Sequence, residues 1–292
     1  MTVADYIEQV AERFHQAPLF FGHGTDNALD EAAYLVCATL DLDFADGELL
    51  VQRELSPEEL TLLESRVRLR IEERLPVAYI TGKAWFSGYR FHSDARALIP
   101  RSPIAELIQN RFESLLGQEP TKILDLCTGG GCIGIAAALT FEQAHVVLAD
   151  ISEDALALAT ENIALHELQG RVTTVRSDLL GNVQGTFDLI LCNPPYVSKE
   201  EVDELPPEYG QEPALGLLSD DAGLQIPLRI LEQAGDFLGD DGLLIMEVGY
   251  SHELLAERLV DVPLLWLEFE FGGDGVFALT GRQLREYRGS FS

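Results

Sequence analysis

The side chains best suited to chemistry lie in the run Asn193-Pro194-Pro195-Tyr196, which directly follows the apolar segment 187–192. The two prolines fix φ and remove backbone donors. The Asn193 amide oxygen and the backbone carbonyls therefore remain as hydrogen-bond acceptors. Tyr196 adds a flat aromatic face. This combination suits a planar group that bears an NH2, either a side-chain amide or the exocyclic amine of a base.

A second element upstream predicts a cofactor site. Residues 122–135 read as a strand carrying Asp125, a turn with Thr128 and the glycines 129–131, and then an apolar helix. The glycines allow positive φ and close approach of the backbone to a ligand. Asp150 ends the next strand, roughly 20 residues later, where doubly wound folds place an acceptor for ribose hydroxyls.

The chemistry of this turn favours a nucleoside over a dinucleotide. The pattern is not GxGxxG, because the third glycine is missing, and Asp125 precedes the turn. A chain with a net charge of −29 is also a poor trap for pyrophosphate. A nucleoside with a cationic tail suits the acidic turn better, and S-adenosylmethionine is such a molecule. Asp178, at the end of the following strand, is a further candidate for this site, with a helix-cap or turn role as the alternative.

The composition limits the class of protein and its partners. Asp and Glu number 49 against 20 Lys and Arg, a balance that repels nucleic acid and attracts basic polypeptides. Adaptation to a salty or acidic cytosol is the alternative explanation. No apolar run approaches the roughly 18 residues of a membrane span. Residues 1–6 contain no basic segment before an apolar one, so we expect no secretory signal. The spacing of the four cysteines and six histidines predicts no metal site. We therefore expect a cytoplasmic protein without membrane contact.

The order of predicted elements indicates an α/β fold with a smaller helical domain. Residues 1–78 contain helical patterns at 3–17, at 28–42 and after Ser56. Residues 79–100 read as a β-hairpin connector. Residues 101–292 begin with a helix that reaches Leu115 and then alternate strands and helices, which implies a doubly wound, mostly parallel sheet.

The later part of this domain carries further expectations. A long polar loop is expected at 197–219, and a helix at 222–238. Strands at 265–271 and 276–279 read as a hairpin, so the last strand is expected to run antiparallel.

These residues resemble a known family. The 125–134 loop, Asp150 and the Asn-Pro-Pro-Tyr run resemble the class I methyltransferases that methylate the amide nitrogen of glutamine. The segments 21–27 and 98–107 are similar to the branch that acts on the third large-subunit ribosomal protein. The sister branch, which acts on peptide chain release factors, usually has Pro-Arg-Pro followed by an acidic residue, whereas Ser102 intervenes here.

The resemblance implies a seven-stranded sheet, S-adenosylmethionine as cofactor, S-adenosylhomocysteine as product, and a role for each matching residue. Asn193 and the Pro194 carbonyl would bind the substrate amide, and Tyr196 would pack on it. These three are the predicted catalytic residues, and Pro195 joins them in substrate binding. The predicted cofactor-binding residues are Asp125, Thr128, Gly129, Gly130, Gly131, Asp150, Asp178 and Asn193. Glu212 and Pro213 also match the family pattern, either for function or for loop shape alone.

The expected function is N5-methylation of a glutamine in the third large-subunit ribosomal protein, either free or within an early assembly particle. Glutamine methylation of release factors is the first alternative. A ribosome-assembly binding factor with secondary methylation is the second, and the N-terminal helices would then dock a basic protein. DNA adenine methylation suits the same tetrapeptide, but the negative charge argues against it.

Overall fold

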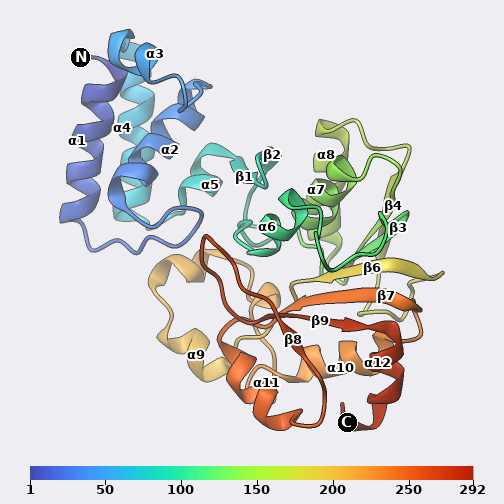
Figure 1. Ribbon diagram of the computed structural model, residues 1–292. Coiled ribbons are helices and arrows are strands. Elements are labelled where there is room, and N and C mark those ends of the chain that lie inside the picture. The colour runs from blue at the N-terminus through green and yellow to red at the C-terminus, as the bar shows by residue number, and fades with distance from the viewer. Residues whose placement is uncertain (292) are drawn as a thin grey trace.

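A seven-stranded mixed sheet organises the larger part of the computed structural model, which describes residues 1–291 (Figure 1). The strands are β3 (Lys122–Leu126), β4 (His145–Asp150), β5 (Val172–Arg176), β6 (Phe187–Cys192), β7 (Leu238–Glu247), β8 (Leu265–Trp266) and β9 (Val276–Thr280). Their order is β5-β4-β3-β6-β7-β9-β8. The first five are parallel, and β9 runs antiparallel to both neighbours. The predicted doubly wound sheet with an antiparallel last strand is confirmed.

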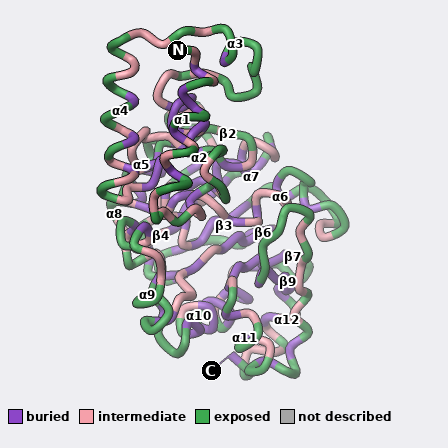
Figure 2. The backbone as a smooth tube through the Cα atoms, turned by 90° about the vertical axis from the view of Figure 1, so that its left-hand side faces the viewer, coloured by how far each residue is buried: buried purple, intermediate pink, exposed green. Residues whose placement is uncertain are grey.

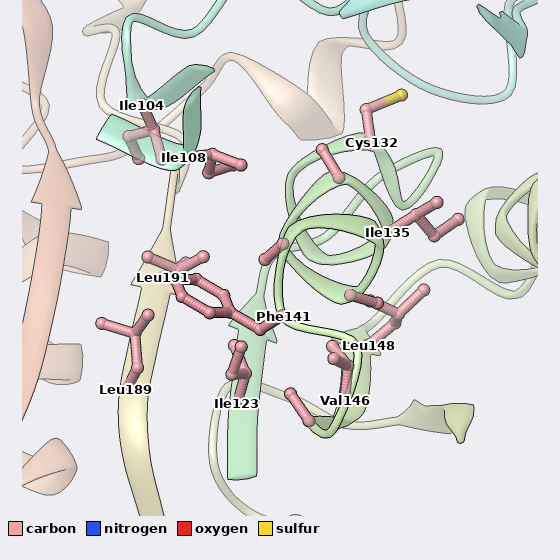
Figure 3. Close-up of a cluster of buried hydrophobic side chains, with 14 of the residues drawn as sticks. Ile104, Ile108, Ile123, Cys132, Ile135, Phe141, Val146, Leu148, Leu189 and Leu191 are labelled. Atoms are coloured by element: carbon pink, nitrogen blue, oxygen red, sulfur yellow. The ribbon is translucent and has the colours of Figure 1, made fainter. Parts of the chain in front are cut away.

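Helices cover both faces of this sheet. One face carries α6 (Ile104–Gln109), α7 (Cys132–Thr140) and α8 (Glu153–Leu165), and the other carries α10 (Gln225–Ala234), α11 (His252–Arg258) and α12 (Gly281–Glu286). Successive residues of a strand point to opposite faces. In β3, Ile123 therefore packs under α6 and α7 (Figure 3), whereas Leu124 joins the opposite core. Because both faces are covered, the central strands β3 and β6 are largely apolar and almost entirely buried (Figure 2).

The first 81 residues form a separate bundle of helices with its own core. The helices are α1 (Val3–Gln16), α2 (Ala28–Leu40), α3 (Gly47–Gln52), α4 (Pro57–Glu72) and α5 (Val77–Thr81). Asn27 caps α2, and Ser56 and Glu59 form a capping box that starts α4. The apolar faces of α1, α2 and α4 meet around Phe14 and Leu63, both fully buried.

A two-stranded hairpin lies between the bundle and the sheet. It consists of β1 (Lys83–Phe86) and β2 (Tyr89–His92), paired antiparallel. The backbone N–H of His92 donates to Asn162 of α8 at 2.7 Å, and Phe91 is fully buried in the core under α7 and α8. The hairpin is therefore fixed to the sheet side of the molecule.

Three local predictions were wrong. The helix expected to reach Leu115 ends at Gln109, because Arg111 and Phe112 adopt positive φ and turn the Phe112 ring into the core beside Phe141. The segment expected to be a strand at 265–271 pairs only over two residues, because the N–H groups of Glu270 and Phe271 donate to the carboxylate of Glu106 instead.

The third error concerns the expected loop at 197–219. It contains helix α9 (Lys199–Glu204) and the 3-10 turns η1 (Pro207–Gln211) and η2 (Ala214–Gly216). Ser198 and Glu201 form a capping box that starts α9. The high polarity of the segment concealed this helix start. Within residues 1–291, no helix is both long and apolar enough to cross a membrane.

Candidate active site

A cavity of about 660 Å³ opens at the carboxyl ends of the parallel strands. This volume lies within the range of small-molecule sites, and the position is where doubly wound sheets bind ligands. Its wall contains most of the predicted site residues, namely Thr128, Gly129, Gly130, Asp150, Asp178, Asn193, Pro194, Pro195 and Tyr196. The structure therefore brings the two predicted half-sites into one cavity.

Asp125 and Gly131 do not belong to that wall. Asp125 is fully buried at the end of β3, and its Oδ2 accepts hydrogen bonds from the Thr128 hydroxyl and from the Gly134 N–H, the latter at 2.8 Å. Burial raises the pKa of Asp125 to about 7. Its Oδ1 has no hydrogen-bond partner among the described residues. Asp125 thus lies behind the glycine turn and links Thr128, which begins the turn, to the first turn of helix α7.

The glycine turn is held by side chains of two neighbouring segments. The Gly129 N–H donates to Asp150 at 2.9 Å, and the Gly130 carbonyl accepts from Asn162 of α8, also at 2.9 Å. Gly129 and Gly131 have φ of 54° and 84°, values that side chains disfavour. A Cβ on Gly131 would also lie 3.0 Å from Leu148. The turn therefore requires glycine at these two positions.

Asp150 and Asp178 differ in their surroundings. Asp150 accepts backbone N–H groups from Gly129 and Ser152, and burial raises its pKa despite these donors. A carboxylate has more acceptor sites than these two bonds use. Asp178 is exposed and pairs with Arg229 of α10, 3.2 Å away. Asp150 is thus a preformed acceptor, whereas Asp178 lies at the solvent-exposed rim of the cavity.

The Asn-Pro-Pro-Tyr run follows β6 and is held mainly through its tyrosine. The Asn193 side chain makes no hydrogen bond to residues 1–291, so its amide is available to a ligand. The Tyr196 hydroxyl donates to Glu247 at the end of β7 over 2.8 Å, and the Tyr196 carbonyl accepts from the Ser251 hydroxyl at 2.9 Å. The Tyr196 ring lies so close to Gly249 that a Cβ there would be 2.7 Å away.

Glu212 is a buried hub that the sequence analysis left open between function and loop shape. Its carboxylate accepts hydrogen bonds from the two terminal guanidinium nitrogens of Arg101, at 2.6 and 2.8 Å. It also accepts the Ile99 N–H at 2.9 Å. His23 Nε2 lies 3.5 Å away and makes no hydrogen bond among the described residues. Burial alone would raise the pKa of Glu212, but His23 and Arg101 outweigh it and hold the pKa at about 2. Glu212 therefore joins the loop after Tyr196 to the segment after the hairpin.

A second buried glutamate joins the same loop to the helical bundle. Glu208 accepts from Arg70 of α4 at 3.2 Å and from the Phe20 N–H at 3.0 Å. The Arg70 side chain also pairs with Glu31 of α2 and donates to the Phe20 carbonyl. Neither Arg70 nor Glu208 was predicted, because nothing in their local sequence distinguishes them from surface charges.

Two family models match the chain. The model described as Methyltransferase small domain matches residues 106–205. The model described as PrmC N-terminal domain matches residues 8–82.

Solved structures show the same fold at low sequence identity. The hMettl16 catalytic domain in complex with MAT2A 3′UTR hairpin 1 has a TM-score of 0.54 and 16% identity, and the match covers 94% of this chain and 91% of that one. The same domain with hairpin 6 has a TM-score of 0.52 and 17% identity, and covers 76% of this chain and 81% of that one. These likenesses concern the fold alone.

Two curated relatives match over nearly the whole chain. The ribosomal protein uL3 glutamine methyltransferase of Xanthomonas campestris pv. campestris is 48% identical, and the match covers 97% of this chain and 92% of the relative. The protein of the same name from Francisella tularensis subsp. tularensis is 43% identical, with coverage of 99% and 93%. At this identity and coverage, the chain belongs to the ribosomal protein uL3 glutamine methyltransferase family.

Proposed function

We propose that the protein transfers the methyl group of S-adenosylmethionine to the side-chain nitrogen of a glutamine in ribosomal protein uL3. The observation that carries this proposal is the shared cavity, whose wall contains both the glycine turn with Asp150 and the acceptors Asn193 and Pro194. A cofactor and an NH2-bearing side chain can therefore meet within one enclosure. The family membership supports the choice of glutamine in uL3.

The donor set of the cavity fits S-adenosylmethionine, which supplies an activated methyl group on a sulfonium. Glycine at positive φ in the turn leaves room for a ligand beside the backbone. Asp150 retains free acceptor capacity for ribose hydroxyls. In this proposal Thr128, Gly129 and Gly130 hold the methionine part, Asp150 holds the ribose, and Asp178 lies beside the adenine. Asp125 acts behind the turn by fixing the Thr128 hydroxyl and the Gly134 N–H.

The proposed work of the Asn-Pro-Pro-Tyr run is to activate and aim a weak nucleophile. An amide nitrogen shares its lone pair with the adjacent carbonyl. Hydrogen bonds from its two N–H groups to the Asn193 amide oxygen and the Pro194 carbonyl increase the electron density on nitrogen and fix its direction. Pro195 keeps these acceptors rigid, and the Tyr196 ring supports the flat face of the amide.

The charge of the chain is consistent with a basic partner. A net charge of −29 attracts a basic polypeptide at long range and repels DNA. We propose that the helical unit 1–78, the hairpin connector 79–100 and the methyltransferase unit 101–292 receive uL3 together, either free or in an early large-subunit assembly particle. The proposed location is the cytoplasm, where a ribosomal protein substrate is made.

Transfer of labelled methyl from S-adenosylmethionine tests this function with three acceptors in parallel. These are methyl-deficient large-subunit particles together with free uL3, peptide chain release factors, and duplex DNA. We expect label on uL3, and loss of that label when the acceptor glutamine is replaced. Label on release factors alone would leave the amide chemistry intact and contradict the uL3 assignment. Label on DNA alone, or on none of the three, would contradict glutamine methylation itself.

A further inference from the structure

A buried carboxylate connects the tyrosine of the Asn-Pro-Pro-Tyr run to the segment that precedes α6. Glu247, at the end of β7, is 6% exposed. Its Oε1 accepts the Tyr196 hydroxyl at 2.8 Å, and its Oε2 accepts the Ser102 hydroxyl at 2.6 Å. Each carboxylate oxygen therefore has one hydroxyl donor, and these two donors come from segments 94 residues apart (196 − 102).

Other contacts hold the backbone and the ring of Tyr196. Its carbonyl accepts from Ser251, and its ring lies against the backbone of Gly249, where no side chain fits. Gly249 itself has a φ of 48°. These contacts place the ring, but only the hydrogen bond to Glu247 fixes the direction of its polar end.

The second donor, Ser102, lies in the segment Pro100-Arg101-Ser102-Pro103, directly before α6. A residue without a hydroxyl at position 102 would leave Glu247 Oε2 without this donor. Ser102 is buried, and its hydroxyl also accepts the Ile104 N–H at 3.2 Å. The Ser102 hydroxyl is therefore held in place by α6 while it donates to the carboxylate.

We infer that Glu247 is a positioning residue that orients Tyr196 toward the acceptor amide, and that Ser102 supports it by holding the second carboxylate oxygen. The inference rests on the proposed function, because Tyr196 is taken to pack on the substrate amide. A Tyr196 ring that is already in position before the substrate amide binds needs no reorganisation during the reaction. Such preorganisation raises the rate of methyl transfer without changing cofactor binding.

A double-mutant cycle separates positioning from a merely structural role. The variants are Glu247→Met, Tyr196→Phe and the combination of both, and Glu257→Met, at an exposed glutamate of α11, is the matched control. The measurements are kcat and KM for methyl transfer to uL3, the Kd of S-adenosylmethionine by calorimetry, and the midpoint of thermal unfolding.

We expect each single variant to lower kcat roughly tenfold, as is typical for loss of a hydrogen bond to a charged group. The double variant is expected to be no slower than the slower single variant, because both changes break the same bond. The Kd of the cofactor stays unchanged, and Glu257→Met matches the wild type. Multiplicative losses in the double variant, or an unchanged kcat in Glu247→Met, would overturn the inference.

Ser102→Ala keeps the test decisive if Glu247→Met does not fold. Because Ser102 acts on Tyr196 through Glu247, we expect Ser102→Ala to lower kcat roughly threefold. In a Tyr196→Phe background, the same substitution should have no further effect. Equal losses in both backgrounds would overturn the inference. A folded wild-type protein that transfers methyl to no acceptor would instead contradict the proposed function, so the two failures are distinguishable.

Discussion

Arg101 and Glu212 form a bidentate ion pair, with nitrogen–oxygen distances of 2.6 and 2.8 Å, between two segments that contribute residues to the cavity wall. Arg101 belongs to the segment after the hairpin, and Glu212 belongs to the loop that follows the Asn-Pro-Pro-Tyr run. The Glu212 side chain is completely buried, whereas Arg101 is partly exposed and also lies over the Tyr209 ring. This pair therefore sets the separation of the segments that enclose the substrate side of the cavity.

Replacement of Arg101 by methionine is expected to destabilise the protein, because it leaves Glu212 buried without its charged partner. Breaking a buried pair in this way costs roughly 3–5 kcal/mol of the free energy of unfolding. Urea unfolding measures this change. The matched control is Arg282→Met, which breaks an exposed pair with Asp241 and should cost less than about 1 kcal/mol. Equal effects of the two variants would contradict a stabilising role for the buried pair.

The same pair predicts how stability depends on pH. The pKa of Glu212 is held at about 2 in the folded protein, against 4.5 for an ordinary glutamate. A lowered folded-state pKa stabilises the fold fully above pH 4.5, and this stabilisation is lost as the pH falls through about 2. The difference in unfolding free energy between the wild type and Glu212→Gln should therefore shrink as pH falls from about 4.5 to 2. A constant difference would show that Glu212 does not titrate as the ion pair requires.

Asn193→Ala and Asp150→Ala should have opposite effects on chemistry and cofactor binding. Asn193 is expected to act on the substrate amide, so its loss should lower kcat by roughly 100-fold, as for a lost catalytic hydrogen-bonding group, with little change in the Kd of S-adenosylmethionine. Asp150 is expected to hold the ribose, so its loss should mainly weaken cofactor binding. Calorimetry and methyl-transfer kinetics on the same preparations measure both quantities. Full activity in Asn193→Ala would rule out its assigned role.

Gly249→Ala is expected to disturb Tyr196 directly. A Cβ at this position would lie 2.7 Å from the Tyr196 ring, on a backbone with a φ of 48°. The ring or the backbone must move, at a cost of roughly 1–3 kcal/mol, and kcat should fall with it. Gly170→Ala is the control, because no atom lies within 4 Å of its Cβ. If the two variants had equal stability and activity, the close contact would have no consequence.

The sequence predicted the elements with strong periodicity and the residues at strand ends. The parallel strands and α8 lie where continuous apolar runs and the Ser152 cap indicated. Because parallel strands end at one edge of the sheet, the predicted wall residues Asp150 and Asn193 meet in one cavity. Their shared position therefore followed from the sequence, whereas the roles that the family resemblance implies for them stay predictions.

The residues that were not predicted depend on contacts between distant segments. Glu247 meets Tyr196 because β7 lies beside β6 in the sheet, and it meets Ser102 across 145 residues. Arg70 and Glu208 meet across 138 residues, and in the sequence each looks like an ordinary surface charge. Asp125 was expected at the cofactor, but it is fully buried outside the cavity wall and bonds to Thr128 and Gly134, a position that its local sequence does not indicate.

The most direct test of the central claim is the mass of uL3 in cells that lack this protein. Mass spectrometry of the glutamine-containing peptides of uL3 compares the deletion strain with strains that carry the wild type or Asn193→Ala. We predict that one glutamine loses a single methyl group in the deletion strain. The wild type should restore the methyl group, whereas Asn193→Ala should not. Unchanged uL3 methylation in the deletion strain, or full restoration by Asn193→Ala, would contradict the account.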